Sequence, residues 1–348
     1  MQLSRALWNS KRGARLILIL AAAAAATPVL TQTQTRFTDD AQRTVDLPAR
    51  VTRVFAAGAP AEVLLYTLAP DLLVGRNRLP EGDAVEFFPS AYRTPTLIRQ
   101  LPEVDNPAAD AELIALKPHL YVDYGTVNAD YVASLDAVQK RTGVPGILLD
   151  GALTRGPAAY RRLGSALGVP ERGERLATAV EAIFTKYRGT AAKPPIRVYL
   201  GCSGDGFVPC LEDDAGGEPL QLLGGVNVAG ARASAPRRPR TIEEIVAMAP
   251  DVVVITGNRG AAARLRAHPE WSKVPAVAAG RVYQWPSLPY SWGARPPSVN
   301  RLPGVMWLSS VLGNRPFDAA FRDDLRGFYR DFYHLELSEA QLQSLLAP

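Results

Sequence analysis

The chain has 348 residues, of which 47% are hydrophobic and 21% are charged, and its 39 Lys and Arg residues exceed its 34 Asp and Glu residues by five. Four of the basic residues (Arg5, Lys11, Arg12 and Arg15) lie in the first 26 residues, so the rest of the chain holds 35 basic residues against 34 acidic ones. The chain after residue 26 is nearly neutral and has no dense basic stripe, so it lacks the positive surface that nucleic-acid-binding proteins usually have. A length of more than 300 residues favours two lobes over a single hydrophobic core.

The first residues have the pattern of a secretory signal peptide. Lys11, Arg12 and Arg15 precede an apolar run over residues 16–26 that ends in alanines, which is the order of charge and apolar residues in such signals. The run is about half as long as a membrane-spanning helix requires, and no cysteine stands where a lipid anchor would need one. We therefore expect residues 1–26 to be removed on export, leaving a periplasmic protein without a lipid anchor.

After this segment, short apolar runs alternate with helical stretches. Residues 53–57 and 120–124 predict strands, while residues 61–68 and 111–116 predict helices, the second of which ends at a Lys-Pro pair. Strand and helix in alternation are typical of an α/β layer. We assign residues 37–152 to an N-terminal α/β lobe.

A helical segment follows over residues 153–192. Its apolar residues recur at helical spacing and are interrupted once, at residues 168–170. The segment lacks the Gly/Ser composition of a flexible tether. We expect it to join the two lobes rigidly.

The remainder, residues 193–348, repeats the α/β scheme as a C-terminal lobe. Residues 196–200 and 252–256 predict strands. The runs 112–122 and 244–254 share one helix–Pro–strand layout, so each lobe contains one copy of the same unit. The predicted fold class is therefore α/β, with two Rossmann-like lobes joined by a single long α-helix and a ligand cleft between the lobes.

The two cysteines, Cys202 and Cys210, are eight residues apart in a segment rich in Gly and Pro. In an exported protein this pattern favours a disulfide that closes one loop. A metal site would need more ligands than this pair. We predict a Cys202–Cys210 disulfide.

Five groups of residues are specific through their order and spacing along the chain: residues 46–48 with 53–54, 116–118, 224–229, 242–256, and 271–277 with 280–283. Together they resemble the periplasmic substrate-binding proteins of ABC importers for iron-siderophores, haem and cobalamin, the family whose lobes are joined by one helix. The late run 295–302 is similar to a version in a branch of this family that handles metal chelates. The resemblance implies a rigid bilobed fold and a ligand held in the cleft, delivered to an ABC permease dimer with its ATPase.

Candidate ligand-binding residues lie in loops after predicted strands, because open α/β sheets bind ligands at the C-terminal edges of their strands. The most distinctive stretch, residues 285–295, holds three large aromatic residues and an arginine. It predicts a wall that stacks on a planar or catecholate-like ligand and pairs with its negative charge, and ordinary packing beneath a loop is the alternative. The candidates are Pro60, Arg76, Tyr124, Phe207, Arg259, Trp285, Tyr290, Trp292 and Arg295.

The resemblance also implies one exposed acidic residue per lobe for docking on the permease, on the helix before a Pro-led strand. Glu243 stands at the matching place in the second lobe. In the first lobe the matching position is Ala111, flanked by Asp110 and Glu112. Glu243 and Glu112 are the docking candidates, with Asp110 as the alternative in the first lobe.

Other classes of protein fit the sequence less well. A direct metal binder would need several converging ligands, and the three histidines, His119, His268 and His334, are widely spaced. No Gly-x-Ser-x-Gly elbow or phosphate loop points to an enzyme. We expect a monomeric binding protein that is not an enzyme and does not bind nucleic acid.

The expected ligand is a small-molecule metal chelate that carries its own metal, so no resident cofactor or protein metal site is predicted. A ferric siderophore comes first, and haem, cobalamin, or a nickel or cobalt chelate are the alternatives. A periplasmic sensor or adaptor on the same fold is the alternative function, followed by an exported enzyme.

Overall fold

The structure is a computed structural model that describes residues 35–75, 80–93, 107–190, 194–234, 237–257 and 259–347. Residues 34–348 form one compact unit. The predicted signal peptide and the candidate Arg76 lie outside the described residues. Within the described ranges, no helix combines the length and the hydrophobicity needed to cross a membrane.

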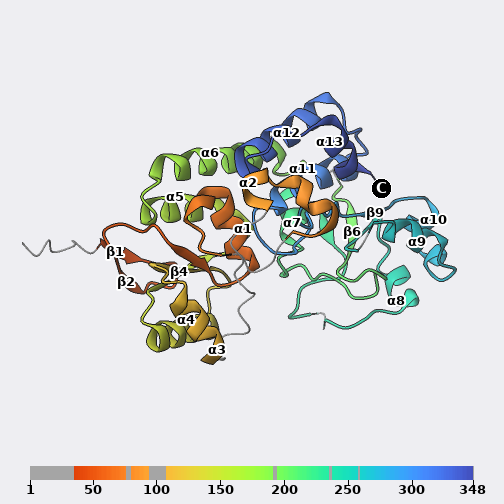
Figure 1. Cartoon of the computed structure of the whole chain (residues 1–348). Coiled ribbons are helices and arrows are strands. Elements are labelled where there is room, and N and C mark those ends of the chain that lie inside the picture. The colour runs from red at the N-terminus through yellow and green to blue at the C-terminus, as the bar shows by residue number, and fades with distance from the viewer. Residues whose placement is uncertain are drawn as a thin grey trace, which may run out of the picture. The chain divides into compact units, whose positions relative to one another are not determined.

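The first half of the unit, on the left in Figure 1, is built on a parallel sheet in the order β3-β4-β5, formed by β3 (Val54–Ala56), β4 (Leu120–Gly125) and β5 (Gly146–Asp150). An antiparallel hairpin, β1 (Thr35–Thr38) with β2 (Thr44–Leu47), precedes it. Because successive strand residues face opposite sides, the sheet buries two apolar faces.

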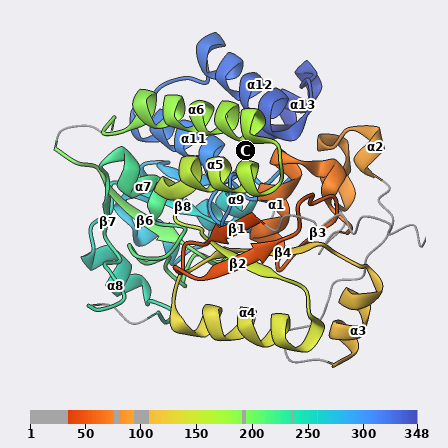
Figure 2. The ribbon, with the colours of Figure 1, turned by 90° about the vertical axis from the view of Figure 1, so that its left-hand side faces the viewer.

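Helices cover both faces of this first sheet. α1 (Ala59–Leu68) and α5 (Gly156–Ala166) pack on the face that carries Val122, while α3 (Pro107–Ala115) and α4 (Ala129–Thr142) pack on the face that carries Tyr121. Figure 2 shows α4 on one side of the sheet and α5 on the other. Asn128 caps the start of α4 by accepting a hydrogen bond from the amide of Tyr131.

The second half contains a parallel sheet in the order β7-β6-β8-β9. Every residue of β8 is buried, as expected for an apolar run covered on both faces. The predicted α/β fold with two sheets is confirmed. The strands are β6 (Arg197–Gly201), β7 (Val226–Asn227), β8 (Val252–Ile255) and β9 (Val282–Gln284).

The helix–Pro–strand unit recurs in both halves with matching detail. The residue before the proline, Lys117 in the first half and Ala249 in the second, has a left-handed backbone, with φ of 47° and 45°. An arginine that opens the neighbouring strand caps each helix end: Arg53 Nε donates to Lys117 O at 3.1 Å, and Arg197 Nε donates to Ala249 O at 3.1 Å. The two sheets therefore share the same capped connection from helix to strand.

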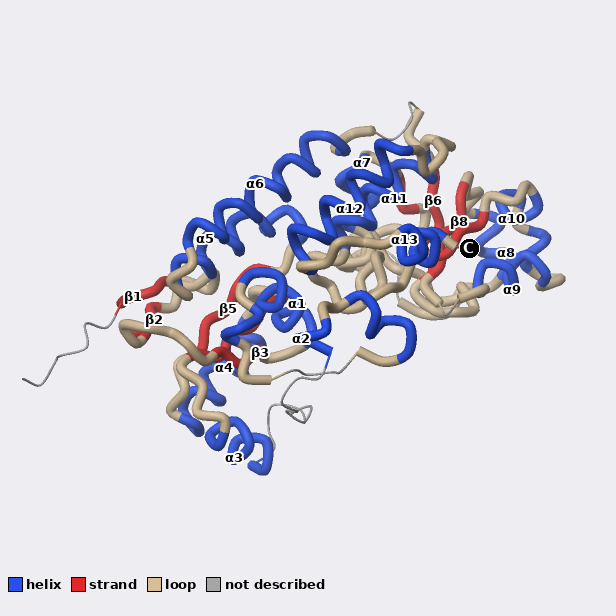
Figure 3. Tube along the Cα trace, turned by 45° about the horizontal axis from the view of Figure 1, so that its top comes forward, coloured by secondary structure: helices blue, strands red, loops and turns tan. Residues whose placement is uncertain are grey.

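Two helices run between the sheets. After α5 the chain turns at residues 167–169 into α6 (Pro170–Tyr187), and the two helices pack closely because a Cβ on Gly173 would lie 2.6 Å from Tyr160 O. α6 is the long helix that the sequence predicted, preceded by the shorter α5, and Figure 3 follows it from α5 toward α7 (Glu218–Leu223).

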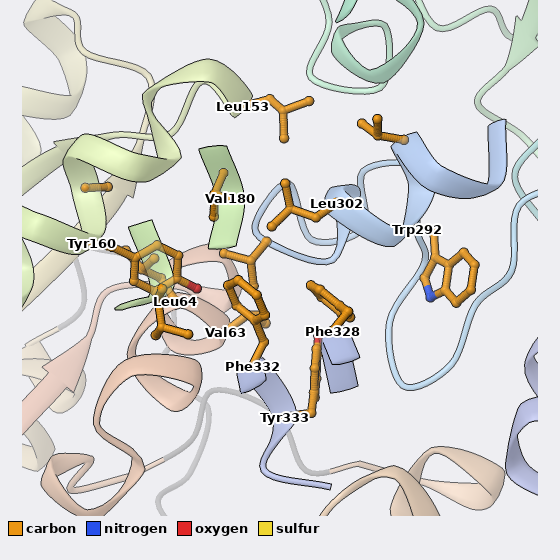
Figure 4. Close-up of a cluster of buried hydrophobic side chains, with 14 of the residues drawn as sticks. Val63, Leu64, Leu153, Tyr160, Val180, Trp292, Leu302, Phe328, Phe332 and Tyr333 are labelled. Carbon is orange, nitrogen blue, oxygen red and sulfur yellow. The ribbon is translucent and has the colours of Figure 1, made fainter. Parts of the chain in front are cut away.

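The hydrophobic core continues from the first half into the second. α11 (Arg301–Leu312) and α12 (Ala319–Tyr333) belong to the same buried cluster as Val122 of β4 and Val254 of β8. Figure 4 shows part of this cluster, including Tyr160, Trp292 and Phe332. The other helices are α2 (Ser90–Arg93), α8 (Ile242–Ala247), α9 (Ala261–Ala267), α10 (Pro275–Ala278) and α13 (Glu339–Leu346), with 3-10 turns at Pro70–Leu72, Gly82–Phe87, Leu153–Arg155 and Trp271–Lys273.

Candidate functional site

A series of adjoining cavities lies where the two sheets present the C-terminal ends of their strands. The first chamber, of about 770 Å³, is lined from the first half by the segments that follow β3, β4 and β5, and from the second half by Asp213, Ala215, Glu218 and Pro297. Both halves thus contribute to one cavity, as the strand-end rule for α/β sheets anticipates.

The second chamber, of about 830 Å³, belongs to the second half. It is lined by residues that follow β6 and β8, among them Cys202, Phe207 and Thr256, and by Arg264 and His268 at α9. Two smaller cavities, of about 170 and 600 Å³, adjoin both chambers and are called the connecting cavities below. Arg295 lines both of them as well as the second chamber, and they share Ala215 and Pro297, respectively, with the first chamber.

A disulfide shapes the wall between these cavities. Cys202 and Cys210 are bonded, which confirms the predicted pairing. They close a small hairpin in which Cys202 N donates to Val208 O at 2.7 Å and Cys210 N donates to Leu200 O at 2.8 Å. The exposed guanidinium of Arg295 donates to Cys202 O at 3.1 Å. The hairpin therefore also positions Arg295.

A buried ion pair ties the two halves together beside the first chamber. The side chain of Arg301 is 1% exposed and contacts the carboxylate of Glu218, and its Nη2 donates to Gly151 O at 2.7 Å. Glu218 also accepts a hydrogen bond from Leu153 N at 3.0 Å. Burial raises the pKa of Glu218, and Arg301 opposes that shift. A buried ion pair is stable only when further hydrogen bonds satisfy its polar groups. Here those bonds come from both halves, so the network fixes their spacing.

A second link crosses between the halves nearby. The Ser298 hydroxyl donates to Pro60 O at 2.8 Å, and Arg301 Nε donates to Ser298 O at 3.1 Å. Sequence reasoning singled out the run 295–302 but assigned no role to Ser298, Arg301 or Glu218. Only their burial in the folded chain shows that role.

Six of the predicted ligand-binding residues line the cavities. Pro60 and Tyr124 line the first chamber, Phe207 lines the second, and Trp285, Tyr290 and Arg295 line the connecting cavities. Burial raises the pKa of Tyr124 to about 12, against an opposing effect of Arg301, so its phenol is neutral at physiological pH. The structure places these residues of the two halves along one series of adjoining cavities.

The two tryptophan candidates are buried, and Arg259 does not line these cavities. Trp285 borders the smallest cavity but is 2% exposed, and Trp292 is 1% exposed, with its indole in the core (Figure 4) and its Nε1 donating to Leu288 O at 3.2 Å. The two indoles are therefore packed beneath a loop, which was the alternative to a ligand-stacking wall. Arg259 points to Ser344 Oγ at 3.2 Å and Asp83 at 3.7 Å.

The docking candidates differ between the halves. Glu243 is exposed in the first turn of α8, where hydrogen bonds from its own backbone amide and from Thr241 lower its pKa. Glu112 on α3 is half-buried, and Asp110 pairs with Arg141 at 2.6 Å. Only the second half thus presents an exposed, charged carboxylate at the anticipated helix position.

The lining of the first chamber contains acidic residues that sequence reasoning did not select. Five carboxylates line it, and the described lining residues include no Lys, Arg or His. Sequence reasoning searched the loops after strands, whereas Asp123 lies within β4. In the described part of the chain, no three His, Cys, Asp or Glu side chains are grouped to hold a metal ion. The lining carboxylates are Asp123, Asp130, Asp150, Asp213 and Glu218.

Residues 158–289 match the family model described as periplasmic binding protein. An ABC transporter solute-binding protein from Sulfurospirillum deleyianum is 22% identical with a TM-score of 0.77, over 89% of this chain and 98% of that one. The predicted resemblance to periplasmic binding proteins is confirmed. The described halves, their sheets and the helix between them are those of the periplasmic-binding fold.

Two further solved structures share this fold. The molybdate periplasmic binding protein of Haemophilus influenzae is 17% identical, with a TM-score of 0.67 over 87% of this chain and 99% of that chain. The periplasmic vitamin B12 binding protein of Vibrio cholerae is 19% identical, with a TM-score of 0.57 over 76% of this chain and 97% of that chain. Likeness at these identities establishes the fold alone. No sequence among the curated proteins matches the chain.

Proposed function

We propose that the chain is the periplasmic solute-binding component of an ABC importer, which captures a metal chelate between its halves and delivers it to a permease dimer with its ATPase. The observation that carries this proposal is the series of adjoining cavities at the C-terminal strand ends of both sheets, three of which are lined by Arg295. The proteins of the same fold are described as binding molybdate in one case and vitamin B12 in another.

Binding rather than catalysis suits the polar groups around the cavities. Ser203 donates to Asp205 Oδ1 at 2.5 Å, and the same oxygen accepts from Phe207 N at 3.2 Å. Both side chains therefore hold the shape of the hairpin. Arg301 and Glu218 are likewise engaged in joining the halves. A nucleophile with an oriented base would require a different set of contacts.

A chelate that brings its own metal suits the donor set. The described residues offer no three-ligand cluster for a bare ion, while Tyr290 and Arg295 face the connecting cavity with an aromatic ring and a guanidinium. Among chelates, a ferric siderophore remains the first candidate, and haem, cobalamin, and nickel or cobalt chelates are the alternatives. Delivery would use the exposed Glu243 of α8 and, in the first half, Glu112 of α3.

The test is an equilibrium titration of the mature protein with ferric siderophores, haemin, cobalamin and nickel chelates, followed by intrinsic tryptophan fluorescence. Trp271 lines the second chamber and Trp285 lines a connecting cavity, so a bound chelate should quench the emission. We expect saturable quenching by one compound, weakened about tenfold or more, equal to about 1.4 kcal/mol, by Arg295→Ala.

The matched control is Arg330→Ala, which removes an exposed arginine that pairs with Asp331 on α12. Its affinity should equal that of the unmodified protein. Failure of every compound in the panel to bind below about 1 mM, equal to about 4 kcal/mol of binding free energy, would contradict the proposal.

A further inference from the structure

We propose that the first chamber contains a side pocket between β4 and α4 that receives a cationic, hydrogen-bond-donating group of the ligand, such as a primary ammonium. The carboxylate of Asp123 supplies the counter-charge, and the hydroxyl of Tyr121 accepts a hydrogen bond. This inference rests on the proposed function and adds a ligand class to it: a chelate with a positively charged end.

The position of Asp123 gives the first reason. Asp123 and Tyr121 alternate on β4 and share the face that packs against Leu135 and Val138 of α4, and all four line the first chamber. The Asp123 side chain is half-buried, and in the described part of the chain it accepts one hydrogen bond, from Tyr124 N at 2.8 Å. Burial raises the pKa of Asp123, and the hydrogen bond from the Tyr124 amide opposes part of this shift. A partly desolvated carboxylate with free acceptor sites favours a cationic donor.

The second half shows that the fold itself does not need this carboxylate. In the repeated unit, where Pro118 corresponds to Pro250, the position of Asp123 corresponds to Ile255 of β8, which is 0% exposed. The strand and its packing can therefore form with an apolar side chain at this position. Since a buried carboxylate costs free energy that an apolar residue does not, its presence in β4 indicates a role in binding.

Tyr121 is an independent observation that points to a ligand. It is 7% exposed, lines the chamber, and stacks on Phe55 with ring centroids 6.0 Å apart and planes 10° apart. No residue in the described ranges forms a hydrogen bond with its hydroxyl. The ring is thus held by packing, while the hydroxyl is free to accept a hydrogen bond from a ligand group that enters the chamber.

The surroundings of the pocket reinforce the preference for positive charge. Of the lining carboxylates, Asp150 lies 3.5 Å from Arg155 and Glu218 contacts Arg301. Asp123 and Asp130, by contrast, have no ion-pair partner among the described residues. Tyr131 of α4 lies against the end of β4, close enough that a Cβ on Gly125 would sit 3.0 Å from its ring. Its partly exposed ring offers a face for a cation.

The test uses three probes with the same four-carbon chain and different ends: putrescine, 1,4-butanediol and succinate. Binding of each to the full mature chain is followed by saturation-transfer NMR of the probe. We expect putrescine alone to bind, and its signal to fall at least about fivefold, equal to about 1 kcal/mol at a tenfold change per 1.4 kcal/mol, in Asp123→Asn. Tyr121→Phe, which removes only the hydroxyl, should cause a smaller fall.

The control is Glu336→Gln, which removes an exposed negative charge that does not line the chamber and should leave the putrescine signal unchanged. Absence of putrescine binding, equal binding of all three probes, or binding unchanged in Asp123→Asn and Tyr121→Phe would overturn the inference. If Asp123→Asn does not fold, Tyr121→Phe decides the outcome alone.

The failure of this inference differs from the failure of the proposed function. Chelates that bind the unmodified protein while putrescine does not would leave the proposed function standing and remove the cationic pocket. Putrescine bound through Asp123, with no chelate of the panel bound, would keep the pocket and remove the assignment to chelates.

Discussion

The two halves share one framework and differ in the charged residues that line the chambers above it. Both have the helix–Pro–strand unit with a left-handed residue before the proline and an arginine that caps the helix end. The charged residues in the described lining of the first chamber are all acidic, whereas the second chamber is lined by Arg264 and Arg295 together with one carboxylate, Asp205. The comparison teaches that the repeated residues specify the sheet, while the residues that differ between the copies specify what the cavity attracts.

The largest effect on stability should come from removing the buried Arg301–Glu218 ion pair that joins the two halves. Arg301→Ala leaves Glu218 and Gly151 O without their buried partner, and we expect it to lower the free energy of unfolding by about 4 kcal/mol. Urea unfolding measures the effect. Arg295→Ala is the control, because an exposed arginine should contribute less than about 0.5 kcal/mol; equal losses in both variants would contradict the role of Arg301.

Exchanging the residue types at the equivalent strand positions sharpens the comparison next. Ile255→Asp places a carboxylate in a fully buried apolar cluster, and we expect a loss of about 3 kcal/mol in the free energy of unfolding. Asp123→Val removes a partly desolvated carboxylate from β4 and should gain about 1 kcal/mol while abolishing putrescine binding. A loss of stability in Asp123→Val would show that the framework does require this carboxylate.

The capping arginines should behave as equals. Arg53→Met and Arg197→Met each remove hydrogen bonds to the last carbonyls of a helix, so we expect each to lower the free energy of unfolding by about 1 kcal/mol. In the double variant the losses should add within about 0.5 kcal/mol, because the two sites are independent. Urea unfolding of the three variants tests this, and a neutral effect of either single change would break the equivalence.

The stability of the protein should depend on pH through the contact of His334 with Tyr66 of α1. His334, the residue after α12, packs beside α1 with Nε2 3.1 Å from Tyr66 O, and burial lowers its pKa from the ordinary 6.5. The unfolded chain therefore takes up this proton first, so stability should fall as the pH drops below about 6.5. Screening of the partly exposed ring keeps the effect below about 1 kcal/mol.

The variant for this prediction is His334→Asn, since asparagine tolerates the left-handed backbone at this position, where φ is 57°. Thermal unfolding between pH 5 and 8 should show a shallower dependence on pH in the variant than in the unmodified protein. Identical slopes would mean that His334 titrates in the folded state as it does in the unfolded chain.

Local patterns in the sequence predicted the framework well. The buried run of β8, the helix–Pro–strand repeat and the Cys202–Cys210 disulfide depend on neighbouring residues, and the structure has all three. Such features can be predicted because the interactions that determine them lie within a few residues of one another.

The candidate site was harder to predict because it depends on the direction of side chains. Trp285 and Trp292 stand in a loop after β9, yet their indoles turn into the core. Asp123 lies within a strand, where a sequence pattern gives no sign of an adjoining cavity, and Arg301 gains its role from residues more than 80 positions away. Ligand contact by Pro60, Tyr124, Phe207, Tyr290 and Arg295 stays a prediction.

The central claim is that one ligand is held by both halves at once, and hydrogen–deuterium exchange of the protein with and without its chelate tests it most directly. Ligand binding should protect amides after β4 and β5 in the first half, and amides of the hairpin and of residues 287–297 in the second half. Protection that includes both sets is the expected result. Protection confined to one half, or to surfaces away from the chambers, would contradict the account.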